Sequence, residues 1–177
     1  MTARPQPARI VLLGAESTGK STLAAALARR HATLWVPEYL REFVETEQRV
    51  PFEADQVAIA RTQLEREDAL ALRLDAQRFL FCDTAPLMTA VYSRIYWGRV
   101  PPALLALEAA HDYALTLVAA PDLPWVPDGL QRESEAVRQR VHACLLEVLE
   151  ARGIAYAMVT GELEERVGQV EGLLAGL

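Results

Sequence analysis

One short segment, Gly14-Ala-Glu-Ser-Thr-Gly-Lys-Ser21, combines the residue types that bind phosphate groups. Its spacing is G-x-x-x-x-G-K-S/T, which is that of a phosphate-binding loop. Gly14 and Gly19 allow backbone angles at which successive N–H groups turn inward around a nucleotide's phosphates. Lys20 would bring its ammonium group to the β- and γ-phosphates, and the Ser21 hydroxyl would complete the shell of a Mg²⁺ ion. The segment therefore predicts a site for a nucleoside triphosphate.

The choice of lysine and the flanking segments support this interpretation. Lys20 is the only lysine among the 18 lysine and arginine residues of the chain, so arginine is avoided at this position alone. The segment Arg9-Ile-Val-Leu-Leu13 predicts a buried strand before the loop. A helix predicted at 20–30 would turn the positive end of its dipole toward the phosphates. Further residues of the loop and helix are expected to contact the nucleotide: Glu16, Ser17, Thr18 and Thr22.

Two carboxylates follow predicted strands, at the edge where parallel α/β sheets bind their ligands. Asp83 comes directly after the apolar run 79–82, as does the Mg²⁺-organising aspartate of many phosphate-loop enzymes. The structural alternative is a helix cap, since Asp83 and Thr84 are both good N-caps. Glu38 could accept hydrogen bonds from vicinal sugar hydroxyls, and Arg41 could hold a phosphate or a carboxamide oxygen. A surface ion pair between Glu38 and Arg41 is the alternative there.

Arginines beyond the fourth predicted strand are candidates for neutralising charge on a transferred phosphoryl group. The segment 120–129 has three prolines and a glycine, which predicts a loop that could serve as a lid. Asp128 lies in this loop and Arg132 lies at the start of the next helix, from which an arginine could be delivered on closure. Arg138 and Arg140 are close competitors, and for each of them a solvated helix face is an equal alternative.

Aromatic residues recur at helical spacing in the segment 91–98. Core packing is the first interpretation of such a pattern. The alternative is that Tyr96 or Trp97 borders a planar ring of a substrate.

Composition excludes several classes of protein. With 177 residues and 51% apolar content, the chain is expected to form one compact domain. A net charge of −6 argues against a nucleic-acid-binding surface. There is neither an apolar run of membrane-spanning length nor a signal-peptide core at 1–8, so no membrane association and a cytoplasmic compartment are expected. Two cysteines and three scattered histidines predict neither a disulfide scaffold nor a metal site built from these residues.

Strand-like and helix-like segments alternate along the chain, which is the signature of a parallel α/β sheet. Strands are predicted at 8–13, 33–36, 78–82, 113–118 and 154–159. Helices are predicted at 20–30, 53–76, 85–96, 102–110, 133–152 and 163–174. The apolar stripe of the long middle helix is expected to comprise Val57, Ala60, Leu64, Ala71 and Leu74.

Taken together, these motifs resemble the ribosylnicotinamide kinase domain of NadR-type proteins. The matching pieces fall in the family's order and span nearly the whole chain, at 14–21, 38–42, 59–63, 82–84, 92–98, 125–129 and 160–161. The resemblance implies a P-loop NTPase fold like that of nucleoside monophosphate kinases, with a five-stranded parallel sheet in a three-layer sandwich and a lid. It implies transfer of the γ-phosphate of ATP, with Mg²⁺, to the 5′-hydroxyl of nicotinamide riboside. The product would be nicotinamide mononucleotide, made in NAD salvage.

The resemblance also implies roles for single residues. Those expected in catalysis are Lys20, Asp83 and Arg132, with Ser21 and Asp83 at the metal. Thr160 and Gly161 would join the phosphate loop in binding the nucleotide. The acceptor would be bound by Glu38, Tyr39, Arg41, Trp97 and Asp128.

The chain departs from the family pattern in three respects. Few aromatic residues that could sandwich a nicotinamide ring lie near Pro37, where Trp35 and Tyr39 are the candidates. The family often reads Asp-Thr-Asp where this chain has Asp83-Thr84-Ala85, and Gln131 stands where the lid usually has arginine. The chain is expected to be a stand-alone kinase, and its oligomeric state stays open. Two rival functions also remain, namely a kinase of another nucleoside or small polyol and a non-catalytic module that senses ATP.

Overall fold

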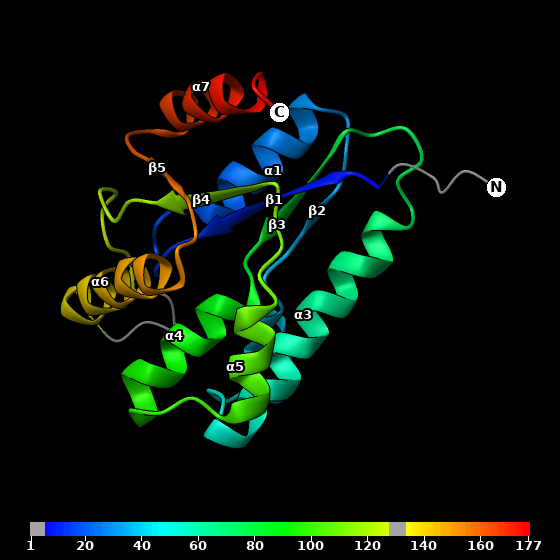
Figure 1. The fold of residues 1–177 in the computed structure, drawn as a ribbon. Coiled ribbons are helices and arrows are strands. Elements are labelled where there is room, and N and C mark those ends of the chain that lie inside the picture. The colour runs from blue at the N-terminus through cyan, green and yellow to red at the C-terminus, as the bar shows by residue number, and fades with distance from the viewer. Residues whose placement is uncertain (1–5, 128–133) are drawn as a thin grey trace.

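Five apolar segments form the strands of one parallel sheet (Figure 1). The computed structural model describes residues 6–127 and 134–177. The strands are β1 (Ala8–Leu13), β2 (Trp35–Val36), β3 (Phe79–Asp83), β4 (Leu115–Ala119) and β5 (Ala157–Val159). They lie in the order β2-β3-β1-β4-β5, and every neighbouring pair is parallel. The predicted five-stranded parallel sheet is therefore confirmed.

Helices cover both faces of this sheet and complete three layers (Figure 1). They are α1 (Lys20–Arg30), α2 (Tyr39–Glu47), α3 (Gln56–Ala71), α4 (Pro86–Trp97), α5 (Pro102–Ala109), α6 (Glu135–Arg152) and α7 (Leu163–Leu174), with a 3₁₀ turn, η1 (Glu53–Asp55). Helices α1 and α7 pack on one face, α4 and α6 pack on the other, and α5 contacts α3 and α4.

The central strand shows why the strands read as continuous apolar runs. Ile10 and Leu12 of β1 point toward α1 and α7, whereas Val11 and Leu13 point toward the opposite helical layer. All four side chains are buried because both faces of the sheet are covered. This packing fixes the direction in which β1 enters the phosphate loop.

The prediction of one long helix at 53–76 is wrong at both ends. Its first residues form the 3₁₀ turn η1, and α3 ends at Ala71. The preceding segment contains α2, which was not among the predicted helices. The strands predicted at 33–36, 113–118 and 154–159 begin later, at Trp35, Leu115 and Ala157. The first residue of the helix predicted at 133–152 lies outside the described residues.

The apolar stripe predicted for the same helix is partly confirmed, since Ala60, Ala71 and Leu74 are buried, but α3 also buries polar side chains that the stripe did not include. Gln63 and Glu67 are buried on it beside Ile59 and Ala60. Gln63 accepts a hydrogen bond from the N–H of Tyr39 at 2.9 Å and donates to the carbonyl of Asp83 at 3.3 Å. A residue that satisfies two backbone groups can be buried without being apolar, so the periodicity of apolar residues could not find this face.

Glu67 is fully buried on α3. It accepts hydrogen bonds from the hydroxyl of Tyr113 at 3.0 Å, and Arg9 lies 3.6 Å away. Burial raises the pKa of the Glu67 carboxyl to about 7, against the lowering effect of Tyr113 and Arg9. The folded protein therefore holds a proton at Glu67 that the unfolded chain has released above its ordinary pKa of 4.5.

This carboxyl should make the protein less stable as the pH rises. The stabilisation from Glu67 is complete below about pH 4.5 and is lost as the pH passes through about 7. Glu67→Gln keeps the shape but carries no titrating proton. As the pH rises through this window, the wild type should lose stability that the variant keeps. The difference between their free energies of unfolding should therefore shift by up to about 3 kcal/mol in favour of Glu67→Gln. Urea unfolding at several pH values measures this difference. An exposed control, Glu147→Gln, should show none, and a constant difference for Glu67→Gln would contradict the prediction.

The carboxyl ends of the strands gather the loops that carry the candidate residues. The phosphate loop follows β1, and Glu38 follows β2. Asp83 ends β3, which pairs with β1 in such a register that Leu12 is opposite Asp83. Because all strands run the same way, these residues meet at one edge of the sheet.

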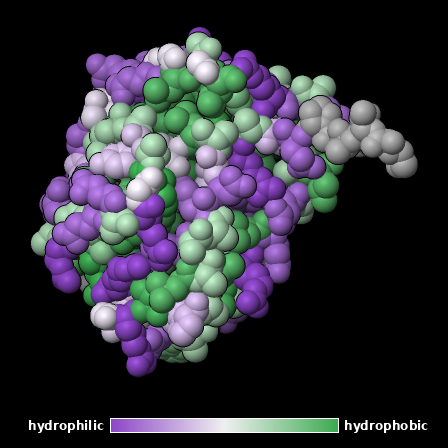
Figure 2. Space-filling view, viewed as in Figure 1, coloured by the Kyte–Doolittle hydropathy of each residue, from purple (hydrophilic) through white to green (hydrophobic). Residues whose placement is uncertain are grey.

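The surface and the helices bear on the expectation of no membrane association. Within the described residues, none of the helices combines the length and the apolar character needed to cross a membrane. On the face shown in Figure 2, hydrophilic residues are interspersed with smaller hydrophobic areas, one of which lies over α5.

Candidate functional site

The loop after β1 has the backbone conformation that the glycine spacing predicts. Gly14 has φ +148° and Gly19 has φ +77°, which side chains rarely adopt. A Cβ atom at Gly14 would also lie 3.0 Å from the carbonyl oxygen of Ala119. The Lys20 ammonium donates to the Ala15 carbonyl at 2.9 Å, so the lysine is held beside the loop that it is expected to serve.

Asp83 lies beside this loop, in contact with the start of α1. The Ser21 hydroxyl donates to Asp83 Oδ2 at 2.5 Å, across 62 residues of sequence. The carboxyl is fully buried, and its Oδ1 atom has no hydrogen-bond partner among the described residues. Burial, and then the charge of Glu38, raise the pKa of Asp83 to about 6, while Lys20 opposes the shift.

The structure does not support the alternative that Asp83 or Thr84 caps the following helix. The N-cap position of α4 is Ala85, and no side chain caps this helix. Ala85 is fully buried at the place where the resembling family often has a second carboxylate. Asp83 therefore faces the phosphate loop and not the helix end.

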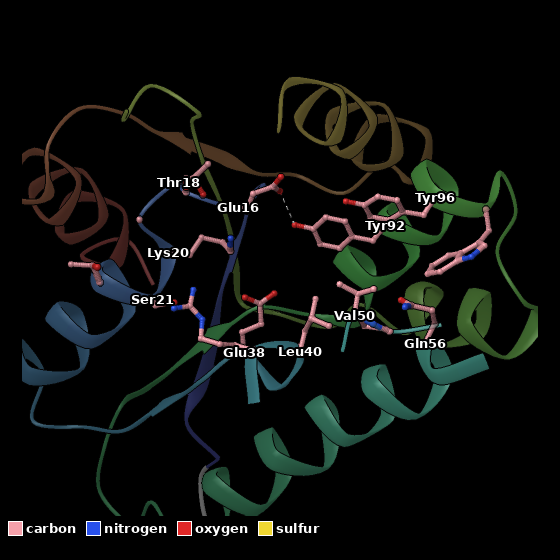
Figure 3. A pocket seen from close by; sticks show the side chains of 16 residues that line it. Glu16, Thr18, Lys20, Ser21, Glu38, Leu40, Val50, Gln56, Tyr92 and Tyr96 are labelled. Atoms are coloured by element: carbon pink, nitrogen blue, oxygen red, sulfur yellow. Dashed lines mark hydrogen bonds between the residues drawn. The ribbon is translucent and has the colours of Figure 1, made fainter. Parts of the chain in front are cut away.

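A cleft of about 460 Å³ opens in front of the loop (Figure 3). Its charged end contains the loop, and its other end is mainly apolar and aromatic. Glu38 points into the cleft between Lys20 and Tyr92 (Figure 3). The lining residues beyond the loop are Glu38, Leu40, Arg41, Val50, Pro51, Gln56, Tyr92, Tyr96 and Trp97. This arrangement can hold a phosphate chain at one end and a flat organic group at the other.

The residues after β2 divide between the cleft and the surface around it. Glu38 and Arg41 both line the cleft. The ion pair of this helix is formed instead by Glu42, which contacts Arg66 at 2.7 Å. Tyr39, expected to bind the acceptor, is not among the cleft-lining residues, and its ring lies 4.5 Å from the Arg66 guanidinium.

Aromatic side chains of α4 form one wall of the cleft. The rings of Tyr92 and Tyr96 stack with centroids 6.2 Å apart, and Trp97 meets Tyr96 edge-on at 5.9 Å. The Tyr92 hydroxyl donates to Glu16 Oε2 at 3.3 Å (Figure 3). Burial and the nearby carboxylates raise the pKa of Tyr92 well above its ordinary value, so the hydroxyl remains a donor. Tyr96 and Trp97 thus border the space that a planar ring could occupy.

Other predicted site residues lie elsewhere. Thr160 and Gly161 do not line the cleft; the Gly161 N–H donates to Asp122 Oδ2 at 2.7 Å. Asp128 and Arg132 fall outside the described residues.

For Arg138 the structure contradicts one of the two equal alternatives, the solvated helix face. Arg138 is only 4% exposed, and its guanidinium donates to the carbonyls of Ser17 at 3.1 Å and of Leu123 at 2.8 Å. The predicted loop after β4 is thereby tied to the phosphate loop.

Several lining residues were missed by the sequence analysis. Val50, Pro51 and Gln56 carry no motif of their own, and Leu40 lies in the matching piece 38–42 but was given no role. Their place in the cleft depends on how α2 and α3 pack. Tyr92 could have been found, since it precedes Tyr96 by one helical turn on the same helix face.

Comparisons with known proteins agree with this geometry. A family model described as an AAA domain matches residues 9–166. The chain is 31% identical over 160 residues to the trifunctional NAD biosynthesis/regulator protein NadR of Escherichia coli (strain K12), covering 86% of this chain and 38% of that protein. The protein of the same name from Salmonella typhimurium is 30% identical over 160 residues, with coverage of 85% and 37%. The chain thus spans well under half the length of these relatives.

Solved structures share the fold. A crystal structure of NadR protein in complex with NR superposes with a TM-score of 0.80 at 22% identity, covering 96% of this chain and 49% of that chain. Thymidylate kinase from Candida albicans gives 0.71 at 15% identity, with coverage of 97% and 92%. Deoxyadenosine kinase from M. mycoides gives 0.69 at 10% identity, with coverage of 96% and 100%. The sheet and its helices are therefore arranged as in nucleoside and nucleotide kinases.

Proposed function

Because the chain belongs to the AAA-domain family and has the phosphate loop of a nucleotide-binding protein, we propose that it is an ATP-dependent kinase of nicotinamide riboside. It would transfer the γ-phosphate to the 5′-hydroxyl and release nicotinamide mononucleotide and ADP. The observation that carries this proposal is a cleft that joins the phosphate loop to Glu38 and an aromatic wall, with Asp83 hydrogen-bonded to Ser21 of the loop. The likeness to the NadR proteins supports the choice of acceptor.

The two ends of the cleft suit the two ends of such an acceptor. Glu38 lies where it could accept hydrogen bonds from the two ribose hydroxyls. Tyr96 and Trp97 offer aromatic faces to the pyridine ring. Gln56 lines the same end, is only 4% exposed and has no side-chain hydrogen bond to any described residue. An amide in that condition can pair with a carboxamide, which also has one donor and one acceptor group.

The residues at the charged end fit a magnesium ion. Asp83 Oδ1 is a buried oxygen without a hydrogen-bond partner among the described residues, and the Ser21 hydroxyl is its neighbour. Both are oxygen ligands of the kind that Mg²⁺ prefers. The part of the chain described here has no group of three or more Asp, Glu, His or Cys residues that could hold a metal. The ion would therefore rely on phosphate oxygens and water as well, and when bound it would neutralise charge on the phosphates.

In this proposal, each of the charged residues at the site has a separate task. Lys20 stabilises the charge of the β- and γ-phosphates, while the N–H groups of the loop surround them. Glu38 orients the ribose so that its 5′-hydroxyl faces the γ-phosphate. Asp83 serves the transfer itself, as the metal partner or as the acceptor of the hydroxyl proton. Residues Asp128 and Arg132 retain their proposed roles in acceptor binding and charge neutralisation, as do Thr160 and Gly161 in nucleotide binding.

The protein should phosphorylate nicotinamide riboside when supplied with MgATP. Mass spectrometry would detect nicotinamide mononucleotide, and the release of ADP would give the rate. Other nucleosides and small polyols serve as comparison acceptors. Preference for one of them by ~100-fold, about 2.7 kcal/mol of transition-state discrimination, would assign the enzyme to that acceptor. Tight ATP binding with no acceptor-dependent ADP release would favour the ATP-sensing alternative.

A further inference from the structure

Two buried arginines contact the backbone of the phosphate loop. Arg138 from α6 is 4% exposed and Arg166 from α7 is 1% exposed. Arg138 donates to the carbonyl of Ser17 at 3.1 Å, and Arg166 donates to the carbonyl of Thr18. Two successive carbonyls of the loop therefore each receive a hydrogen bond from a charged donor that comes from a separate helix.

The same guanidinium groups also hold the segment after β4. Arg138 donates to the carbonyls of Leu123 at 2.8 Å and Pro121 at 3.4 Å. Arg166 donates to the carbonyl of Ala120 at 3.1 Å. Several backbone acceptors thus fix each arginine, so its positive charge has a defined position beside the loop.

The carboxylates that pair with these arginines lie nearer to solvent. Glu135 contacts Arg138 at 2.7 Å and is 48% exposed, and Asp122, the partner of Arg166, is 37% exposed. Water screens an exposed carboxylate more strongly than a buried guanidinium. The guanidinium charge of each pair is therefore screened less than the charge of its carboxylate partner.

A hydrogen-bond donor that contacts a backbone carbonyl also affects the N–H of the next residue, because the two groups belong to the same peptide unit. The Ser17 carbonyl shares its peptide unit with the N–H of Thr18, and the Thr18 carbonyl shares its unit with the N–H of Gly19. Hydrogen bonds in a chain polarise one another, so a charged donor on the carbonyl makes the N–H a stronger donor. These N–H groups belong to the loop that is expected to surround the phosphates.

We propose that Arg138 and Arg166 are positioning residues that set the affinity of the loop for phosphate. They hold two successive carbonyls of the loop and add positive charge beside it, without touching the acceptor. Neither residue lines the cleft. The inference depends on phosphate binding at the loop, which the proposed function shares, but it does not depend on the identity of the acceptor.

The test compares three methionine variants by isothermal titration calorimetry. Arg138→Met and Arg166→Met remove the guanidinium groups. Arg152→Met is the matched control, because Arg152 lies on α6 and contacts the buried Glu108 at 3.3 Å, away from the loop. The ligands are ATP, tripolyphosphate as a probe without a base, and nicotinamide riboside. Thermal melting identifies a temperature at which every variant is folded.

The two loop variants should bind ATP and tripolyphosphate about 10-fold more weakly than the wild type, since each loses charge-assisted hydrogen bonds. Their affinity for nicotinamide riboside should be unchanged, as should all affinities of Arg152→Met. Normal tripolyphosphate affinity in folded Arg138→Met and Arg166→Met would overturn the inference. Equal weakening in the Arg152→Met control would also overturn it, since the loss would then be a general effect of removing an arginine.

Lysine variants keep the test decisive if a methionine variant does not fold. Arg138→Lys and Arg166→Lys retain the charge but lack the rigid planar guanidinium, whose donors point in the fixed directions of these carbonyls. They should bind tripolyphosphate about 3-fold more weakly than the wild type, and unchanged affinity would contradict the proposal. If the wild type binds tripolyphosphate but no riboside, the proposed acceptor is wrong, whereas the comparison among the variants still decides the role of the arginines.

Discussion

Replacing Lys20 by alanine should abolish phosphoryl transfer and leave the fold intact. The Lys20 ammonium contacts the Ala15 carbonyl at 2.9 Å and takes no part in the hydrophobic clusters of the described residues. Its charge is expected to act where negative charge builds up on the phosphates during transfer. Loss of such a preorganised charge should reduce kcat by about 10³-fold or more, which is ~4 kcal/mol of transition-state stabilisation. Steady-state assays of ADP release, with circular dichroism to verify folding, would measure both parts of the prediction.

Lys20→Arg is the matched variant, because it keeps the positive charge and changes its shape. The planar guanidinium is larger than the ammonium, so this variant should also lose most of its activity. Recovery of near-normal turnover by Lys20→Arg would mean that charge alone suffices. Near-normal turnover in a folded Lys20→Ala variant would contradict the kinase assignment.

Asp83→Asn should lower kcat by roughly 10²-fold or more, with little effect on the KM of the acceptor. Asparagine preserves the shape and can still accept the hydrogen bond of Ser21, but it has neither the charge to organise a metal nor the basicity to take a proton. Because these properties matter in the transition state, the loss should fall on kcat. Initial rates at varied concentrations of nicotinamide riboside, with MgATP saturating, provide the measurement.

Glu38→Gln is the counterpart of Asp83→Asn and should show the opposite kinetic pattern. Glu38 points into the cleft (Figure 3), whereas Asp83 is fully buried and accepts a hydrogen bond from Ser21. A hydrogen bond to the ribose would be present in both the ground state and the transition state, so its loss should mainly raise the KM of the acceptor. If Glu38→Gln instead lowers kcat and Asp83→Asn raises KM, then Glu38 is the base.

The sequence was sufficient to predict the architecture and the charged end of the site. Alternating strand and helix patterns predict a parallel sheet, and in such sheets the residues that follow the strands meet at one edge. The hydrogen bond between Ser21 and Asp83 agrees with this expectation, although the two residues are 62 positions apart. The motif of the phosphate loop identified Ser21, and the rule that ligands bind at the carboxyl ends of parallel strands identified Asp83.

The apolar end of the cleft and the polar interior could not be predicted in the same way. Gln56, Gln63 and Glu67 lie on a helix whose expected stripe was apolar, and each is buried. Gln63 and Glu67 have partners on other elements, and Gln56 faces the cleft. Arg138 likewise has the sequence pattern of a surface residue, and only its backbone acceptors explain its burial. Such positions depend on tertiary contacts, which no local periodicity reveals.

The division of the cleft has a consequence for how the chain could evolve. The phosphate end is built by the loop after β1 and by the end of β3, both anchored in the sheet. The other end is lined in part by Val50, Pro51 and Gln56, which belong to none of the three hydrophobic clusters of the described residues. Substitutions there need not disturb the core, because most of its stabilisation comes from other side chains. A lineage could therefore exchange one acceptor for another while its phosphate chemistry stayed the same, through changes confined to a few residues outside the sheet.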